Sequence, residues 1–155
     1  MLEEIFRKGY KVVNGDRMIG IVIISHGSFA EHLVKSAELI VGKQEKVTSV
    51  HMLEGESPEK FEEKLRKAIK TVKSSDGVLI LADLFGGSTV RVAAQFLFEE
   101  ENVEVVAGVN MPMLLEVLLN RKHKDLKSLV KIAIDAGKNG VVDFRERLVK
   151  NKVKD

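Results

Sequence analysis

The sequence predicts an α/β fold, doubly wound, with a mainly parallel sheet flanked by helices. Short apolar runs alternate along the chain with longer segments whose apolar residues recur at helical spacing. Strands that alternate with helices form parallel sheets with right-handed crossovers. The 155 residues, 45% of them hydrophobic, are enough for one domain of ordinary size.

The first strand is expected over residues 19–24, an unbroken apolar run that stops at a Ser-His-Gly-Ser turn, residues 25–28. Such a run, bounded by turn residues, is typical of a strand buried on both faces. An amphipathic helix follows and ends at Gly42, a residue suited to a helix C-cap. The second strand is expected over residues 47–51.

The second helix is expected to begin at Ser57-Pro58, since serine suits the N-cap and proline the first helical position. The third strand, residues 78–82, leads through an Asp-Leu-Phe-Gly-Gly-Ser segment into a third helix. A fourth strand is expected over residues 103–109. A short apolar helix then begins at Asn110, and a further helix is expected to end near Gly137.

A last short segment, residues 141–144, is predicted to form an edge strand. Residues 1–17 are polar and precede Met18, so we interpret them as an appended or loosely packed segment. The domain is then expected to span residues 18–144, followed by a basic tail over residues 145–155, typical of a solvated chain end.

Composition excludes several classes of function. The formal net charge of +2 gives no electrostatic reason to expect a nucleic-acid partner. The chain has 0 cysteines, which excludes disulfides and thiolate chemistry and fits a cytoplasmic protein. No apolar stretch reaches the roughly 18 residues that a membrane-spanning helix needs.

His26 is the leading candidate for a functional side chain. Ligands of open α/β sheets bind just beyond the carboxyl ends of the strands, which is where His26 stands. An unperturbed imidazole titrates near pH 6.5, so it can act as a nucleophile or base near neutral pH.

A carboxylate and a glycine-rich helix start are expected at the same edge of the sheet. Asp83 follows the third strand and can accept one ring N–H of the histidine, which makes the other nitrogen nucleophilic. Gly86, Gly87 and Ser88 open the next helix and leave backbone N–H groups for an anion. The chain has no Walker or Gly-x-Gly-x-x-Gly motif, so phosphate would arrive on another molecule.

Each feature also has a purely structural interpretation. A histidine at a strand end can hydrogen-bond a turn, an aspartate there can cap a helix, and the glycines can serve only the turn. The presence of the histidine, the aspartate and the glycines at one edge of the sheet favours a functional site over three separate structural roles. Of the other histidines, His32 and His123 lie among charged residues, and only His51, at the end of the second strand, could reach the same edge.

Four motifs in order resemble one family. They are residues 21–27, the Gly55-Glu56 turn, residues 83–88 and residues 108–113. From Met18 to Phe144 the chain resembles the IIA component of the mannose family of the bacterial sugar phosphotransferase system.

The resemblance implies a phosphocarrier without cofactor or metal. Its histidine, here His26, would take phosphate from the histidine-containing phosphocarrier protein and pass it to a IIB subunit, which serves the membrane IIC and IID subunits. Asp83 would orient His26 through the delta nitrogen, leaving the epsilon nitrogen to carry phosphate. The resemblance also implies a homodimer in which the last short strand is exchanged.

Further residues are assigned to the same site. Gly27 is expected to join Gly86, Gly87 and Ser88 in binding phosphate. Ser25, Asn110 and Met111 are expected at its rim.

Two alternatives remain at this point. A related subunit of the same fold phosphorylates the cofactor of dihydroxyacetone kinase. Small tetrapyrrole chelatases also carry a His-Gly-Ser turn after a first strand, but that function needs a second metal-binding histidine, for which His51 is the candidate. In the family that the chain resembles, the carrier never touches the sugar, so its residues do not specify which sugar is transported.

Overall fold

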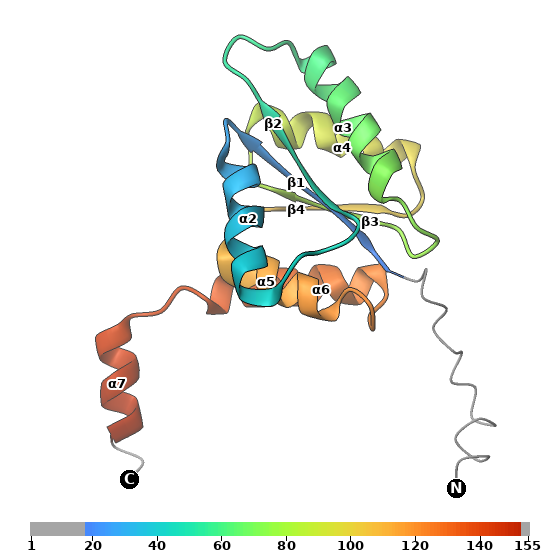
Figure 1. Cartoon of the computed structure of the whole chain (residues 1–155). Coiled ribbons are helices and arrows are strands. Elements are labelled where there is room, and N and C mark those ends of the chain that lie inside the picture. Colours follow the sequence, from blue (N-terminus) through green and yellow to red (C-terminus); the bar gives the residue numbers. More distant parts are fainter. Residues whose placement is uncertain (1–17, 153–155) are drawn as a thin grey trace, which may run out of the picture.

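Four parallel strands form the centre of the molecule (Figure 1). The computed structural model describes residues 18–152, so the predicted appended segment, residues 1–17, lies outside them. The strands are β1 (Gly20–His26), β2 (Val47–Met52), β3 (Val78–Ala82) and β4 (Val103–Ala107). Their order in the sheet is β2-β1-β3-β4. The predicted α/β class and parallel sheet are confirmed.

Helices cover both faces of the sheet, as a doubly wound fold requires (Figure 1). One face packs against α2 (Phe29–Val41), α5 (Met111–Asn120) and α6 (Leu126–Asn139). The opposite face packs against α3 (Pro58–Val72) and α4 (Ser88–Glu99). Two hydrophobic cores result, one on each side of the sheet.

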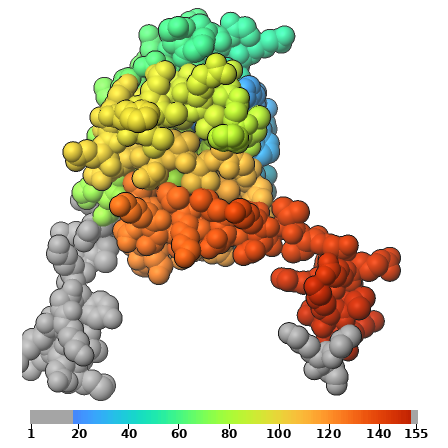
Figure 2. All heavy atoms as spheres, turned by 180° about the vertical axis from the view of Figure 1, so that it is seen from behind, coloured from blue at the N-terminus to red at the C-terminus, as the bar shows by residue number. Residues whose placement is uncertain are grey.

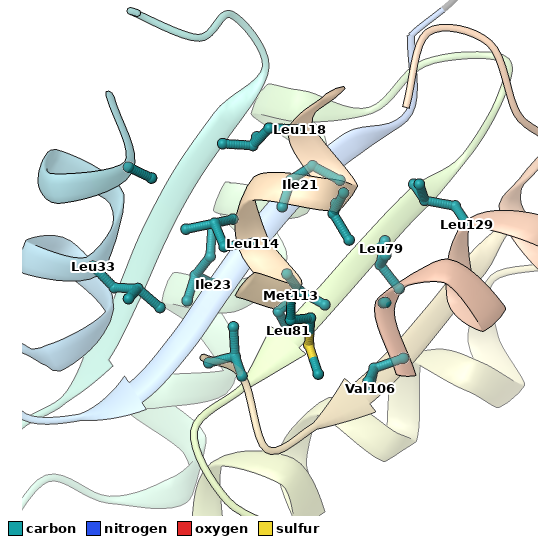
Figure 3. Close-up of a cluster of buried hydrophobic side chains, with 14 of the residues drawn as sticks. Ile21, Ile23, Leu33, Leu79, Leu81, Val106, Met113, Leu114, Leu118 and Leu129 are labelled. Atoms are coloured by element: carbon teal, nitrogen blue, oxygen red, sulfur yellow. The ribbon is translucent and has the colours of Figure 1, made fainter. Parts of the chain in front are cut away.

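The first strand contributes to both cores because successive side chains of a strand point to opposite faces. Ile21 and Ile23 pack on the side of α5, beside Leu114 (Figure 3). Val22 and Ile24 pack on the other side. All four of these β1 side chains are fully buried. The continuous apolar run in the sequence is therefore the signature of a central parallel strand, which has no solvated face.

Capping residues set most of the predicted helix boundaries. The Ser57 side chain accepts the Lys60 N–H at 3.2 Å, and Asn110 caps α5. Three expected element ends are wrong by two residues. The first strand continues past residue 24 to His26. Gly108, with φ of +91°, ends the fourth strand at Ala107 and not at residue 109. Gly137 lies inside α6, where its lack of a side chain leaves room for Met113, and the helix continues to Asn139.

The predicted edge strand at residues 141–144 is also wrong for the single chain. Residues 141–143 have no regular secondary structure, and Phe144 begins a helix, α7 (Phe144–Lys152), that stands away from the domain (Figures 1 and 2). Local interactions favour the helix: the Asp143 side chain accepts the Glu146 N–H, and Glu146 pairs with Lys150 one turn later. A strand here would need a neighbouring strand, which this segment lacks within the described chain.

A buried arginine connects the chain segments at the amino-terminal ends of β1 and β2. Arg121, at the end of α5, is only 2% exposed. Its guanidinium donates to the carbonyl oxygens of Ile19 at 3.3 Å and Glu45 at 2.6 Å, and to the side chain of Gln44 at 3.2 Å. Burial lowers the pKa of Arg121 to about 10. This side chain joins three segments that are distant in the sequence.

Replacing Arg121 with methionine should destabilise the fold. The apolar side chain fills similar space but leaves the backbone oxygens around it without their donor, at a cost of about 2–4 kcal/mol. Arg121→Lys should lose less, although one ammonium cannot reproduce the fork of the guanidinium. Chemical denaturation measures both, with the exposed Arg145→Met as control. Equal unfolding free energies for Arg121→Met and Arg145→Met would contradict the stabilising role of the buried Arg121 side chain.

Candidate functional site

The candidate site lies where the chain changes sides of the sheet. The chain leaves β1 for α2 on one face and leaves the adjacent β3 for α4 on the other. At such a switch point, loops diverge beyond the carboxyl ends of two neighbouring parallel strands and leave a place for a ligand. His26 is the last residue of β1, and Asp83 directly follows β3. The predicted common edge for these two side chains is confirmed.

One carboxylate oxygen of Asp83 binds His26 twice. The backbone N–H of His26 donates to Oδ2 at 2.8 Å, and the ring Nδ1 lies 2.7 Å from the same oxygen. A carboxylate only accepts hydrogen bonds, so the ring proton of a neutral His26 belongs on Nδ1. The lone pair is then on Nε2, the nitrogen that is free to attack.

The other carboxylate oxygen is held by the loop and helix that follow. Oδ1 of Asp83 accepts the Leu84 N–H at 2.9 Å and the Thr89 hydroxyl at 3.1 Å. Thr89 is fully buried, in the first turn of α4. Sequence reasoning missed Thr89, although it stands next to the predicted phosphate-binding Ser88. It fixes the carboxylate plane and thereby the direction in which Oδ2 faces His26.

Burial and hydrogen bonding act in opposite directions on Asp83. Its side chain is 11% exposed and that of His26 is 44% exposed. Burial raises the pKa of Asp83, but the hydrogen bonds from His26, Leu84 and Thr89 outweigh burial and hold the pKa below its usual value. Asp83 is therefore a carboxylate at neutral pH, while the imidazole it orients reaches solvent.

The glycine-rich turn lies against the histidine ring. A Cβ atom at Gly87 would stand 2.8 Å from Cε1 of His26 and 3.6 Å from Nε2, too close for any side chain to fit without a shift of the ring. Gly87 is also the N-cap of α4, and no side chain caps that helix end. Its first N–H groups thus remain available next to Nε2. Gly27 and Gly86 supply the positive φ angles, +57° and +85°, of the two turns, and Ser88 is exposed.

The three predicted rim residues have structural roles. Ser25 is fully buried, and its hydroxyl donates to the Gly27 carbonyl and accepts the Ala30 N–H. Asn110 accepts the Met113 N–H and donates to the Gly137 carbonyl. Met111 is half-buried against the core formed with α5. Ser25 thus shapes the turn that follows His26, whereas Asn110 and Met111 hold the start of α5.

The second histidine required of a chelatase faces the other way. His51 pairs in register with Ser25, one residue before His26, so its side chain projects to the opposite face of the sheet from that of His26. Within residues 18–152, no group of three histidine, aspartate or glutamate side chains is arranged to hold a metal ion. The structure gives the chelatase alternative no support.

No helix within the described residues is long and apolar enough to cross a bilayer.

The sequence model for the family described as "PTS system fructose IIA component" matches residues 20–134, and this range contains both His26 and Asp83. The chain belongs to this family. It is a IIA component of the mannose family of the phosphotransferase system, as its motifs predict.

Several relatives are similar over most of the chain. The mannose-specific EIIAB component of Escherichia coli K12 is 38% identical over 132 residues, which are 84% of this chain but 41% of that protein. The fructose-specific EIIA component of Bacillus subtilis 168 is 38% identical over 73% of this chain and 77% of its own length. A crystal structure of EIIA from Streptococcus agalactiae superposes with a TM-score of 0.76 at 31% identity, covering 83% and 99% of the two chains. The chain thus spans about two-fifths of the E. coli relative.

Gly87→Ala should disturb the orientation of the His26 ring. The added methyl group cannot occupy its position 2.8 Å from Cε1 without a shift, and we expect the ring to move and the contact between Nδ1 and Oδ2 to lengthen. Long-range ¹H–¹⁵N NMR of the imidazole should then show loss of the single Nδ1–H tautomer. Gly86→Ala is the control, because its Cβ meets open space and adds only backbone strain. Identical ring spectra for the two variants would contradict the proposed packing role.

Proposed function

We propose that the chain is a phosphocarrier of a sugar phosphotransferase system. His26 accepts phosphate from the histidine-containing phosphocarrier protein and passes it to a IIB subunit, which serves the membrane IIC and IID subunits. The observation that carries this proposal is the 2.7 Å contact between Nδ1 of His26 and Oδ2 of Asp83 on an exposed imidazole. A cytoplasmic location is part of this proposal, and the lack of cysteine in the sequence is compatible with it.

The proposed transfer moves one phosphoryl group between two imidazoles. The Nε2 lone pair of His26 attacks phosphorus, a new P–N bond forms, and the P–N bond to the donor histidine breaks with its electron pair returning to the donor. The His26 proton stays on Nδ1, so the ring becomes positively charged as it is phosphorylated. Asp83 stabilises that charge at 2.7 Å. Transfer to the IIB nucleophile reverses these changes at His26.

The start of α4 supplies the phosphate-binding groups in this proposal. Uncapped N–H groups and the positive end of the helix dipole favour an anion at this position. Gly86 and Gly87 keep side chains out of the approach, and the exposed Ser88 hydroxyl can donate to a phosphate oxygen. Gly27 directly follows His26 and likewise leaves open the space that a side chain would occupy.

Exposed apolar side chains next to the site favour a protein as phosphate donor. Phe29 follows His26 by three residues and is 47% exposed. Leu84 and Phe85 follow Asp83 directly and are 49% and 89% exposed. Exposed apolar side chains gathered at one place mark contact surfaces between proteins.

The relatives whose names specify a sugar favour a sugar system over the dihydroxyacetone kinase alternative. Their names differ in the sugar: mannose, fructose and sorbose.

Phosphorylation by the phosphocarrier protein, its upstream kinase and phosphoenolpyruvate tests the proposal. Intact mass at alkaline pH should show one added phosphoryl group, which acid removes because a phosphoramidate is acid-labile. The label should be lost in His26→Ala and kept in the matched control His51→Ala. Asp83→Asn, which can favour the other tautomer, should slow transfer by about one to several orders of magnitude. Labelling that persists in His26→Ala would refute the assignment.

We also propose a homodimer in which residues 141–144 are exchanged between two chains. One edge of β4 has no neighbouring strand among the described residues, and an unpaired edge can accept a strand from another chain. Val141, Val142 and Phe144 are 78%, 50% and 72% exposed in the single chain, which leaves apolar area for a partner to cover. Phe144, the first residue of α7, would then have to leave the helix to complete the exchanged strand.

Truncation before Gly140 tests the exchange. Light scattering should find a dimer for the full chain, and thermal unfolding should find a lower midpoint for the truncated chain, because the edge of β4 loses its neighbour. The control is truncation after Lys152, which leaves the exchanged segment in place. A truncated chain that is monomeric and as stable as the full chain would contradict exchange.

A further inference from the structure

The loop between β2 and α3 is held by a glutamate that neither core nor catalysis requires. Glu56 Oε2 accepts the Leu53 N–H at 2.8 Å, and the Glu56 N–H donates back to the Leu53 carbonyl at 3.1 Å. Gly55, with φ of +71°, allows the turn between them. The two residues therefore close a small ring of hydrogen bonds at the tip of the loop.

A lysine on the following helix fixes this loop to the end of the strand. Lys64 Nζ donates to Oε2 of Glu56 at 2.8 Å and to the His51 carbonyl at 2.6 Å. The Glu56 side chain is only 7% exposed. The hydrogen bond from Lys64, followed by that from the Leu53 N–H, holds the pKa of Glu56 below its usual value. The charged pair thus fixes the loop to both α3 and β2.

The loop fixed in this way stands beside the histidine. Met52 pairs in register with His26, and its carbonyl accepts the Gly27 N–H at 3.0 Å. Leu53 is the next residue and is 55% exposed. Glu56 therefore determines where an exposed apolar side chain sits on the β2 side of His26, opposite the β3 side that carries Leu84 and Phe85.

We infer that Glu56 and Lys64 are positioning residues for the encounter with the protein that brings phosphate to His26. This inference rests on the proposed function. In this inference the pair holds Leu53, the residue after the register partner of His26, in the face that the donor protein covers. Neither Glu56 nor Lys64 is among the hydrogen-bond partners of His26 or Asp83. The pair acts on binding of the donor protein and leaves the reactivity of Nε2 unchanged.

Two phosphoryl donors separate binding from chemistry. The first is the phosphorylated phosphocarrier protein, and the second is phosphoramidate, a small donor that makes no use of a docking surface. Glu56→Gln should raise KM for the protein donor by about 5- to 10-fold, since an unfixed loop must be ordered on binding. Its rate with phosphoramidate should match that of the wild type.

Matched variants test the individual contacts. Lys64→Met should reproduce the rise in KM, and Lys64→Arg, which keeps a cationic donor, should restore a value near that of the wild type. Leu53→Ser removes the exposed side chain without touching the loop hydrogen bonds, and should also raise KM for the protein donor alone. Glu54→Gln is the control, since it removes a charge from an exposed position in the same loop.

The outcomes separate this inference from the proposed function. An unchanged KM for both Glu56→Gln and Leu53→Ser overturns the inference, as does an equal loss of rate with both donors. Wild-type protein that accepts phosphate on His26 from neither donor overturns the proposed function and this inference with it. A raised KM confined to the protein donor, with Glu54→Gln unaffected, supports both.

Discussion

The contact of one Asp83 oxygen with two groups of His26 is the constraint on which the site depends. Oδ2 holds the backbone N–H, which fixes where β1 ends, and the ring Nδ1, which fixes how the imidazole faces. Oδ1 is in turn held by the Leu84 N–H and the Thr89 hydroxyl. Strand, loop and helix thus converge on a single carboxylate, whose charge is maintained because these hydrogen bonds keep its pKa low.

The fold is what makes this convergence possible. His26 and Asp83 are 57 residues apart in the sequence and meet because β1 and β3 are parallel neighbours whose crossovers lie on opposite faces of the sheet. A central strand buried on both faces leaves its end little freedom to move. At the amino-terminal end of β1, the Arg121 side chain donates a hydrogen bond to the Ile19 carbonyl and thereby holds the start of the strand. The imidazole of His26 is therefore held at Nδ1, while its side chain is 44% exposed to solvent.

The features predicted correctly are those with a local physical cause. The apolar run of β1, the Ser57-Pro58 helix start and the Asn110 cap each carry their signal within a few residues. The strand–helix alternation was sufficient to bring His26, Asp83 and Gly87 to one edge. Sequence reasoning missed the buried partners Thr89 and Arg121, because their importance arises from contacts with distant segments. Residues 141–144 form no strand in the single chain, because this apolar segment has no neighbouring strand among the described residues, and the exchanged strand stays a prediction for the dimer.

The position of the phosphate on the ring tests most directly whether Asp83 directs the chemistry of His26. Protein labelled with ¹⁵N in histidine is phosphorylated, and ¹H–¹⁵N NMR with phosphorus coupling identifies the nitrogen that bears phosphorus. A carboxylate 2.7 Å from Nδ1 keeps the proton there, so the phosphate is expected on Nε2, with Nδ1 still protonated. Phosphate on Nδ1 would mean that the contact with Asp83 breaks before transfer, and would contradict the account.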